Sequence, residues 1–168
     1  MDLGHDRNIA ESVTILALAF RAGLASRDGD QITVEPADLE SDRHRGFDLI
    51  LRRNNRWLLV DVTSSRRYKG GKVQRAVGHA KRGGRWVYIL KVDWLAATET
   101  ALDPCFDRVY SRLIDGEPIA LEEACPKHGN KCTIARKLFE FGGRVNQTLV
   151  NSPTEAKNFS MEVIRPPF

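Results

Sequence analysis

Two aspartates, Asp48 and Asp61, stand out in this chain of 168 residues because each interrupts a short apolar segment. A charged side chain in such a segment is costly unless it is paired or binds a metal. Two carboxylates held close together repel each other. A divalent cation relieves that repulsion, and oxygen ligands favour Mg²⁺ or Mn²⁺. Such an ion can lower the pKa of a bound water and neutralise charge on a scissile phosphate. The alternative is that each aspartate pairs with a nearby arginine.

The two aspartates converge if their segments form a hairpin, and the sequence between them predicts one. Residues 47–52 and 56–63 are expected to be strands, and the second is apolar on both faces, as a central strand would be. The pair Asn54-Asn55 suits the tight turn between them, because asparagine tolerates positive φ. Thr63, two residues beyond the second aspartate, would point to the same face of the sheet.

The rest of the chain predicts an α/β (α+β) fold. A first helix, capped by Asp6 and ended by Gly23 and the 28–30 cluster, is indicated by apolar residues at Ile9, Val13, Leu16, Phe20 and Leu24. The other expected elements are strands at 31–35 and 85–92 and helices at 72–82, 106–114 and 133–141. We expect a core domain over residues 1–95 and a C-terminal helical extension over residues 96–168 that packs on it.

The aspartates and the element order together resemble the PD-(D/E)XK nuclease superfamily, also called restriction-endonuclease-like. The resemblance covers roughly residues 6–92. It rests on Phe47-Asp48, on Asp61-Val62-Thr63 and on the order helix, three strands, helix, strand. It implies a mixed sheet flanked by helices, hydrolysis of phosphodiester bonds in DNA, and a metal ion bound by the two aspartates.

Two positions depart from the motif of that family. Phe47 stands where the motif has proline, and Thr63 stands where it has a lysine that helps to position or activate water. Some members supply the lysine from the following helix, which makes Lys72 the first choice here and Lys69 the second. If no lysine reaches the metal, the domain would bind DNA without cutting it.

Two further residues gain a role from the resemblance. Glu11 matches an acidic residue that some members place on the first helix, where it would also bind the metal. Gln74 resembles a glutamine that some members use near the site. Each has a plainer interpretation, because an acidic residue is favoured in the first turn of a helix and a glutamine is ordinary on a solvent-facing helix.

Positive charge is concentrated around the predicted site. Residues 43–85 hold thirteen of the 26 lysines and arginines and only two acidic residues, so this segment carries +11 and the rest of the chain −7. The asymmetry predicts a face that binds a polyanion, although a solvated basic surface is the alternative. Trp57 and Trp86 lie within predicted strands and are expected in the core. The residues expected to contact nucleic acid are Arg43, Arg45, Ser64, Arg66, Arg67, Tyr68, Lys69 and Arg75.

A second group of potential metal ligands lies in the C-terminal half. Cys125, His128 and Cys132 fall within eight residues, in a segment whose proline and glycine favour turns. Cys105 could be the fourth ligand of a Cys₃His zinc site. The alternative is that Cys105 is an ordinary buried cysteine at the start of a helix.

Three functions are compatible with these patterns. The first is a Mg²⁺- or Mn²⁺-dependent endonuclease or exonuclease acting on nucleic acid, with DNA favoured. The second is a catalytically inactive module that binds nucleic acid, and the third is a protein-interaction factor. A homodimer or a larger complex is compatible with each. The longest apolar run, residues 15–20, is too short to cross a bilayer, and no secretory signal is visible. We therefore expect a cytoplasmic protein with no membrane partner.

Overall fold

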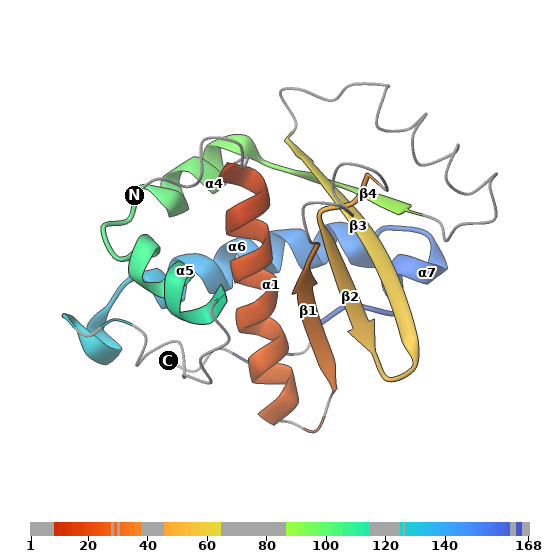
Figure 1. Ribbon diagram of the computed structural model, residues 1–168, viewed down its shortest axis with the longest axis horizontal. Helices are drawn as coiled ribbons and strands as arrows, with labels where there is room; N and C mark the ends of the chain where they lie inside the picture. Colours follow the sequence, from red (N-terminus) through yellow and green to blue (C-terminus); the bar gives the residue numbers. More distant parts are fainter. Residues whose placement is uncertain are drawn as a thin grey trace.

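The computed structural model describes residues 9–27, 29, 31–37, 46–64, 87–114, 125, 127–161 and 164–165. Within these ranges the chain is a mixed α/β protein with a four-stranded sheet flanked by helices (Figure 1). Its elements are α1 (Ile9–Arg27), β1 (Ile32–Pro36), β2 (Leu49–Arg53), β3 (Arg56–Ser64), β4 (Val87–Val92), α4 (Trp94–Ala101), α5 (Phe106–Ile114), the 3₁₀ turn η2 (Gly129–Lys131), α6 (Ile134–Val150) and α7 (Thr154–Lys157).

The sheet has the strand order β1-β2-β3-β4. β1 pairs antiparallel with β2, and β2 pairs antiparallel with β3, whereas β4 pairs parallel with β3. The β2–β3 turn is the predicted one: Asn54 has a φ of 55°, in the left-handed region that asparagine tolerates. β3 lies between β2 and β4, and it is buried from Leu58 to its end.

The two faces of the sheet have different environments. Side chains alternate between faces along a strand. Val60 and Val62 of β3 join the main hydrophobic core, which also contains residues of α1 and α6. Leu59 instead belongs to a smaller apolar group with Phe47 and Val87. Asp61 and Thr63, which alternate with the valines, thus lie on the face turned away from α1.

Helix α1 is buried on most of its circumference, more than a single apolar stripe predicts. It lies alongside β1 while α6 crosses it (Figure 1). Ile15, Leu16 and Leu18 are all at most 1% exposed, and the neighbouring Thr14 is fully buried. Thr14 satisfies its hydroxyl by donating to the carbonyl of Ala10 at 2.5 Å. Each large aliphatic side chain buried in this way contributes about 1.5–3 kcal/mol, so the helix anchors the core.

The α1–α6 crossing is held by a buried arginine seated against two glycines. Arg21 donates from Nε and Nη2 to the carbonyl oxygen of Phe139, at 3.2 and 2.7 Å. Its guanidinium also lies 4.0 Å from the centre of the Phe139 ring. A Cβ at Gly142 would lie 2.8 Å from Arg21 Nε, and one at Gly143 would lie 2.8 Å from Nη2. The glycines therefore leave the space that the arginine fills.

Several boundaries differ from the expected ones. α1 passes through Gly23 and ends at Arg27, directly before the predicted 28–30 cluster, and α6 continues past residue 141 to Val150. α4 and α7 were not expected at all. The expected division at residue 95 falls inside α4, and the main core includes residues from both sides of it. None of the helices in the described ranges combines the length and apolarity that a bilayer span requires.

The expectation that Trp57 lies in the core is wrong. Its side chain is 42% exposed, because it sits at the turn end of β3 rather than at the buried centre. The guanidinium of Arg52 stacks 4.3 Å from the Trp57 ring centre. The helix expected at 72–82 and Trp86 lie outside the described residues.

Candidate functional site

Asp48 lies at the point where β2 separates from β3. Its backbone N–H still donates to the carbonyl of Val60, at 2.8 Å. The last ladder pair of the two strands is Leu49 with Val60, so β2 offers no backbone partner to Val62. The carboxylate of Asp48 takes that place: Oδ2 accepts the Val62 N–H at 2.7 Å. Asp48 is thereby fixed against β3 by two hydrogen bonds, one donated by its backbone and one accepted by its side chain.

Asp61 lies next to Asp48, as the hairpin predicts. The two side chains are hydrogen-bonded to each other, and they are 6% (Asp48) and 5% (Asp61) exposed. Burial raises the pKa of Asp48 to about 9, helped by the negative charge of Glu11 and by the hydrogen bond and charge of Asp61, and opposed by the Val62 N–H. A pKa this high keeps Asp48 protonated at neutral pH, where its side chain is hydrogen-bonded to that of Asp61. A shared proton is the usual outcome when two carboxylates are held in contact away from water.

Glu11, on α1, is the third acidic residue predicted for this site, and its link to the pair is electrostatic. It is half-buried in the first turn of α1, and its charge acts on Asp48. Thr63, which stands in the motif-lysine position, is 3% exposed on the same face as Asp61. Ser64 was expected to contact nucleic acid, but it is only 3% exposed at the end of β3.

The other residues predicted for this site lie outside the described ranges. These are Lys72 and Gln74, together with Arg43, Arg45, Arg66, Arg67, Tyr68, Lys69 and Arg75. Two described arginines of the basic segment have structural partners. Arg52 pairs with Glu35 at 2.8 Å, and Arg53 donates to the carbonyl of Asn158 at 2.8 Å.

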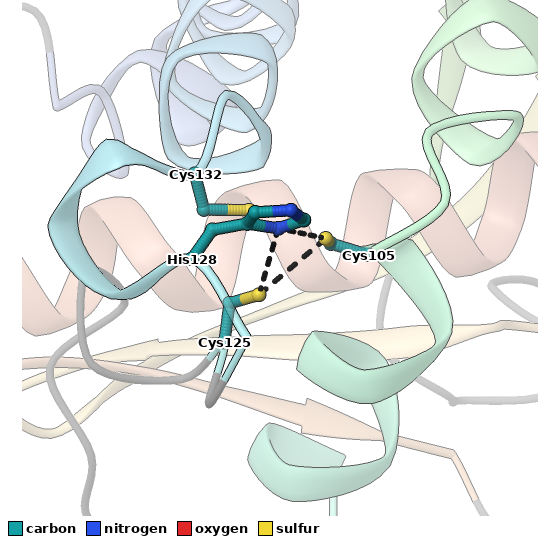
Figure 2. A group of neighbouring side chains, drawn as sticks. All are labelled: Cys105, Cys125, His128 and Cys132. Carbon is teal, nitrogen blue, oxygen red and sulfur yellow. Dashed lines mark hydrogen bonds between the residues drawn. The ribbon is translucent and has the colours of Figure 1, made fainter.

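The four predicted zinc ligands come together in a second group, the Cys/His cluster, formed by Cys105, Cys125, His128 and Cys132. Their ligand atoms all lie within 4.8 Å of one another. Figure 2 shows the four side chains pointing toward one another. Cys105 Sγ lies 3.4 Å from Cys125 Sγ and 3.2 Å from His128 Nδ1, and Cys125 Sγ lies 3.5 Å from the same nitrogen. This donor set could hold a metal ion such as zinc.

Burial and mutual contact set the protonation of the three thiols. Burial, with help from the neighbouring thiols, raises the pKa of Cys105 to about 12, and burial also raises the pKa of Cys132. Burial opposes ionisation of Cys125 as well, but the His128 backbone N–H and the side chains of Cys105, His128 and Cys132 lower its pKa to about 6. The lowered pKa of Cys125 favours its thiolate form, and cysteines must be deprotonated to bind a metal ion.

Sequence reasoning missed a residue that joins the two halves of the cluster. Asp103 is 6% exposed. Its carboxylate accepts the Cys105 N–H at 2.9 Å and the Thr133 hydroxyl at 2.9 Å, and it lies 3.1 Å from the Lys137 ammonium. Burial opposes the charge of Asp103, but these three donors hold its pKa below the usual range. The signal was an aspartate two residues before a helix-starting cysteine, which favours a cap.

Comparisons of the chain with protein-family models, with curated proteins and with solved structures find no match. The resemblance to the PD-(D/E)XK nucleases therefore depends on the residues and on their geometry alone.

Proposed function

We propose that the chain is a metal-dependent nuclease that hydrolyses phosphodiester bonds in DNA, on a restriction-endonuclease-like core. The observation that carries the proposal is the contact between the Asp48 and Asp61 carboxylates at the end of a hairpin, where the charge of Glu11 also acts on Asp48. The element order of α1, three antiparallel strands and a parallel β4 supports the same interpretation.

The acidic group fits a hard divalent cation. Two buried carboxylates that must share a proton gain from exchanging it for a cation, and all-oxygen donors favour Mg²⁺ or Mn²⁺. When bound there, the ion lowers the pKa of a coordinated water and neutralises charge on the scissile phosphate. Asp48 and Asp61 would hold the ion, and the negative charge of Glu11 would favour its binding. The Val62 N–H keeps the Asp48 carboxylate oriented toward its partner.

The lysine that the motif lacks has a replacement on β4. Lys91 is the register partner of Thr63 in the parallel β3–β4 ladder. Alternation along β4 puts Lys91 on the face of Val87 and Ile89, which is also the face of Asp61. An ammonium at this position would orient the attacking water and stabilise charge on the phosphate.

The test is whether the purified protein, dialysed without a chelator into buffer lacking Mg²⁺ and Mn²⁺, cleaves linear, circular and branched DNA and RNA. Each substrate is incubated with Mg²⁺, with Mn²⁺ and without either ion. The wild type should cleave only with an ion. Asp61→Asn should lower the rate by at least about 100-fold, because it removes a ligand while keeping the side-chain shape. Glu99→Gln, an exposed change on α4, is the matched control.

Thr63 favours a second candidate, a nuclease-like module that binds nucleic acid without cutting it. Metal-independent, salt-sensitive binding without cleavage would select that function over the first. A protein with no affinity for any of the nucleic acids would exclude both and leave a protein-interaction factor.

The role of Lys91 can be separated from the two lysines proposed from the sequence. Lys91→Met should reduce the cleavage rate by about 100-fold while changing DNA binding little, since positioned acid–base and orienting groups contribute about 10²–10⁴-fold. Lys157→Met, on α7, is the control. Unchanged cleavage by Lys91→Met, with loss of cleavage by Lys72→Met or Lys69→Met, would assign the role to the basic segment instead.

A further inference from the structure

We propose that Cys105, Cys125, His128 and Cys132 bind one Zn²⁺ in a closed, structural site that fastens α5 to α6. The proposal does not depend on the nuclease function, because it is argued from the geometry of the Cys/His cluster alone. All three cysteines of the chain are in this cluster, and none of them forms a disulfide.

The distances within the Cys/His cluster match those of a tetrahedral zinc site. Zn–S bonds of about 2.3 Å and a Zn–N bond of about 2.0 Å place the ligand atoms about 3.5–3.8 Å apart. The measured separations from Cys105 Sγ are 3.4 Å to Cys125 Sγ and 3.2 Å to His128 Nδ1. These two separations are within about 0.4 Å of the tetrahedral values. All four ligand atoms lie within 4.8 Å of one another, so the remaining atoms would draw together when the ion binds. Three sulfurs and one imidazole nitrogen are soft donors that select zinc over magnesium or calcium.

The backbone between Cys125 and Cys132 is folded to present its ligands to one point. Gly129 adopts a φ of 57° and donates its N–H to the Cys125 carbonyl at 2.8 Å. The 3₁₀ turn η2 follows, and the Cys132 N–H closes it on the Gly129 carbonyl at 3.2 Å. The tight turn brings Cys125, His128 and Cys132 to one side. Backbone N–H groups of His128 and Ile134 also bond to the Cys125 and Cys132 sulfurs.

The fourth ligand, Cys105, comes from the start of α5 and is kept in place by Asp103. That carboxylate bonds the Cys105 N–H on one side, and Thr133 and Lys137 on the other. Thr133 directly follows Cys132 and precedes α6. A carboxylate bridging the ligand segments around a metal site is a common supporting arrangement, because it fixes ligand orientation.

Four protein ligands leave no open coordination position, so the ion would be structural rather than catalytic. Its bonds would join residue 105 to residues 125–132 and so fix the start of α6, which packs on α1. A Cys105–Cys125 disulfide is the competing use of the same atoms. Such a disulfide would use two of the four donor atoms and would not explain why Cys132 and His128 converge on the same point.

The test is the zinc content of the full-length protein after purification without chelators, measured by elemental analysis and by native mass spectrometry. One Zn²⁺ per chain is expected, with all three thiols protected from a thiol reagent. Replacement of zinc by Co²⁺ in the wild type should give the absorption of a tetrahedral thiolate site. Cys105→Ser and Cys132→Ser should each lower zinc affinity by more than tenfold.

Two variants keep the outcome interpretable. His128→Cys should retain the ion, because it replaces one good zinc ligand by another, and Lys131→Ala, an exposed change in the same turn, should also retain it. A wild-type protein that contains no zinc and does not bind added Zn²⁺ would overturn the proposal. So would a Cys105–Cys125 disulfide in the protein as isolated under reducing conditions, or zinc content unaffected by both serine variants.

Discussion

The two potential metal sites of this chain are built in opposite ways. The Asp48–Asp61 pair would take its ligands from a sheet hairpin of the core, where the charge of Glu11 on α1 also acts. The Cys/His cluster takes its ligands from turns at the ends of helices. In the first, like charges are brought together and a proton relieves the repulsion between them. In the second, the thiols of Cys105 and Cys132 have raised pKa values and only that of Cys125 is lowered, so the ligands meet with less charge repulsion.

This difference would separate a catalytic metal site from a structural one. A few carboxylates fill only part of the coordination shell of a hard cation such as Mg²⁺, which leaves positions for water and substrate. Soft donors that fill all four positions bind zinc tightly and exclude both. Removing the ion should therefore change activity at one site and folding at the other.

The largest effect is expected when zinc is removed. Treatment with a strong chelator should lower the melting temperature by at least about 10 °C, because structural zinc contributes several kcal/mol of folding free energy and each kcal/mol is worth about 2–4 °C at this size. The measurement is a thermal melt by circular dichroism before and after chelation. Zinc added back should restore the melt. A chelated protein that melts at the same temperature would remove the contrast between the sites.

A smaller effect is expected from the residue that supports the cluster. Asp103→Asn should weaken zinc binding by about 10–100-fold, because it weakens the bonds that orient Cys105 and the start of α6. Competition with a chromogenic chelator gives the affinity. Asp107→Asn, four residues further along the chain on α5, serves as the control. Equal affinity for the two variants would show that the ligands alone orient the site.

The smallest of the three effects concerns Asp48 and depends on pH. The folded-state pKa near 9 exceeds the unfolded value near 4, so the folded protein binds more protons between these values. The stability contribution of this group is complete below about pH 4 and is lost as pH rises toward 9. Asp48→Asn mimics the protonated form and should raise the free energy of unfolding at pH 8 by about 1–3 kcal/mol.

Urea unfolding at pH 5 and pH 8, in zinc-loaded protein without added Mg²⁺ or Mn²⁺, tests this prediction. The gain from Asp48→Asn should be smaller at pH 5. Added Mg²⁺ should stabilise the wild type but not the variant, because only the wild type can exchange its proton for the ion. A variant less stable than the wild type at pH 8 would mean that the aspartate is ionised and compensated in the fold.

Much of the fold could be predicted because the relevant signals are local. The apolar spacing of α1, the asparagine turn and the alternation of the strands each depend on neighbours in sequence, and the helix at Phe106–Ile114 matches the expected range. The juxtaposition of Asp48 and Asp61 followed from the same hairpin. The Cys/His cluster was predictable from residue type, since three of its four ligands lie within eight residues.

What could not be predicted depends on distant partners. The end of α6 was placed too early because Gly142 and Gly143 normally weaken a helix, yet here Arg21, more than a hundred residues away, packs against them. Asp103 meets Thr133 across 30 residues, and no local pattern marks that pair. Lys91 was overlooked because a parallel strand pairing, rather than the motif spacing, puts it beside Thr63.

The Asp48 carboxylate, which accepts the Val62 N–H, combines a structural role with the proposed chemical one at a single position. The Asp48 side chain accepts the backbone hydrogen bond that β2 no longer accepts at this point. Asp48→Ala would therefore remove the acceptor of the Val62 N–H as well as a potential metal ligand. Inactivity of such a mutant would be ambiguous between damage and mechanism. Asparagine, which can still receive that N–H, is the informative replacement, and any screen of this chain that relies on alanine alone would misjudge the residue.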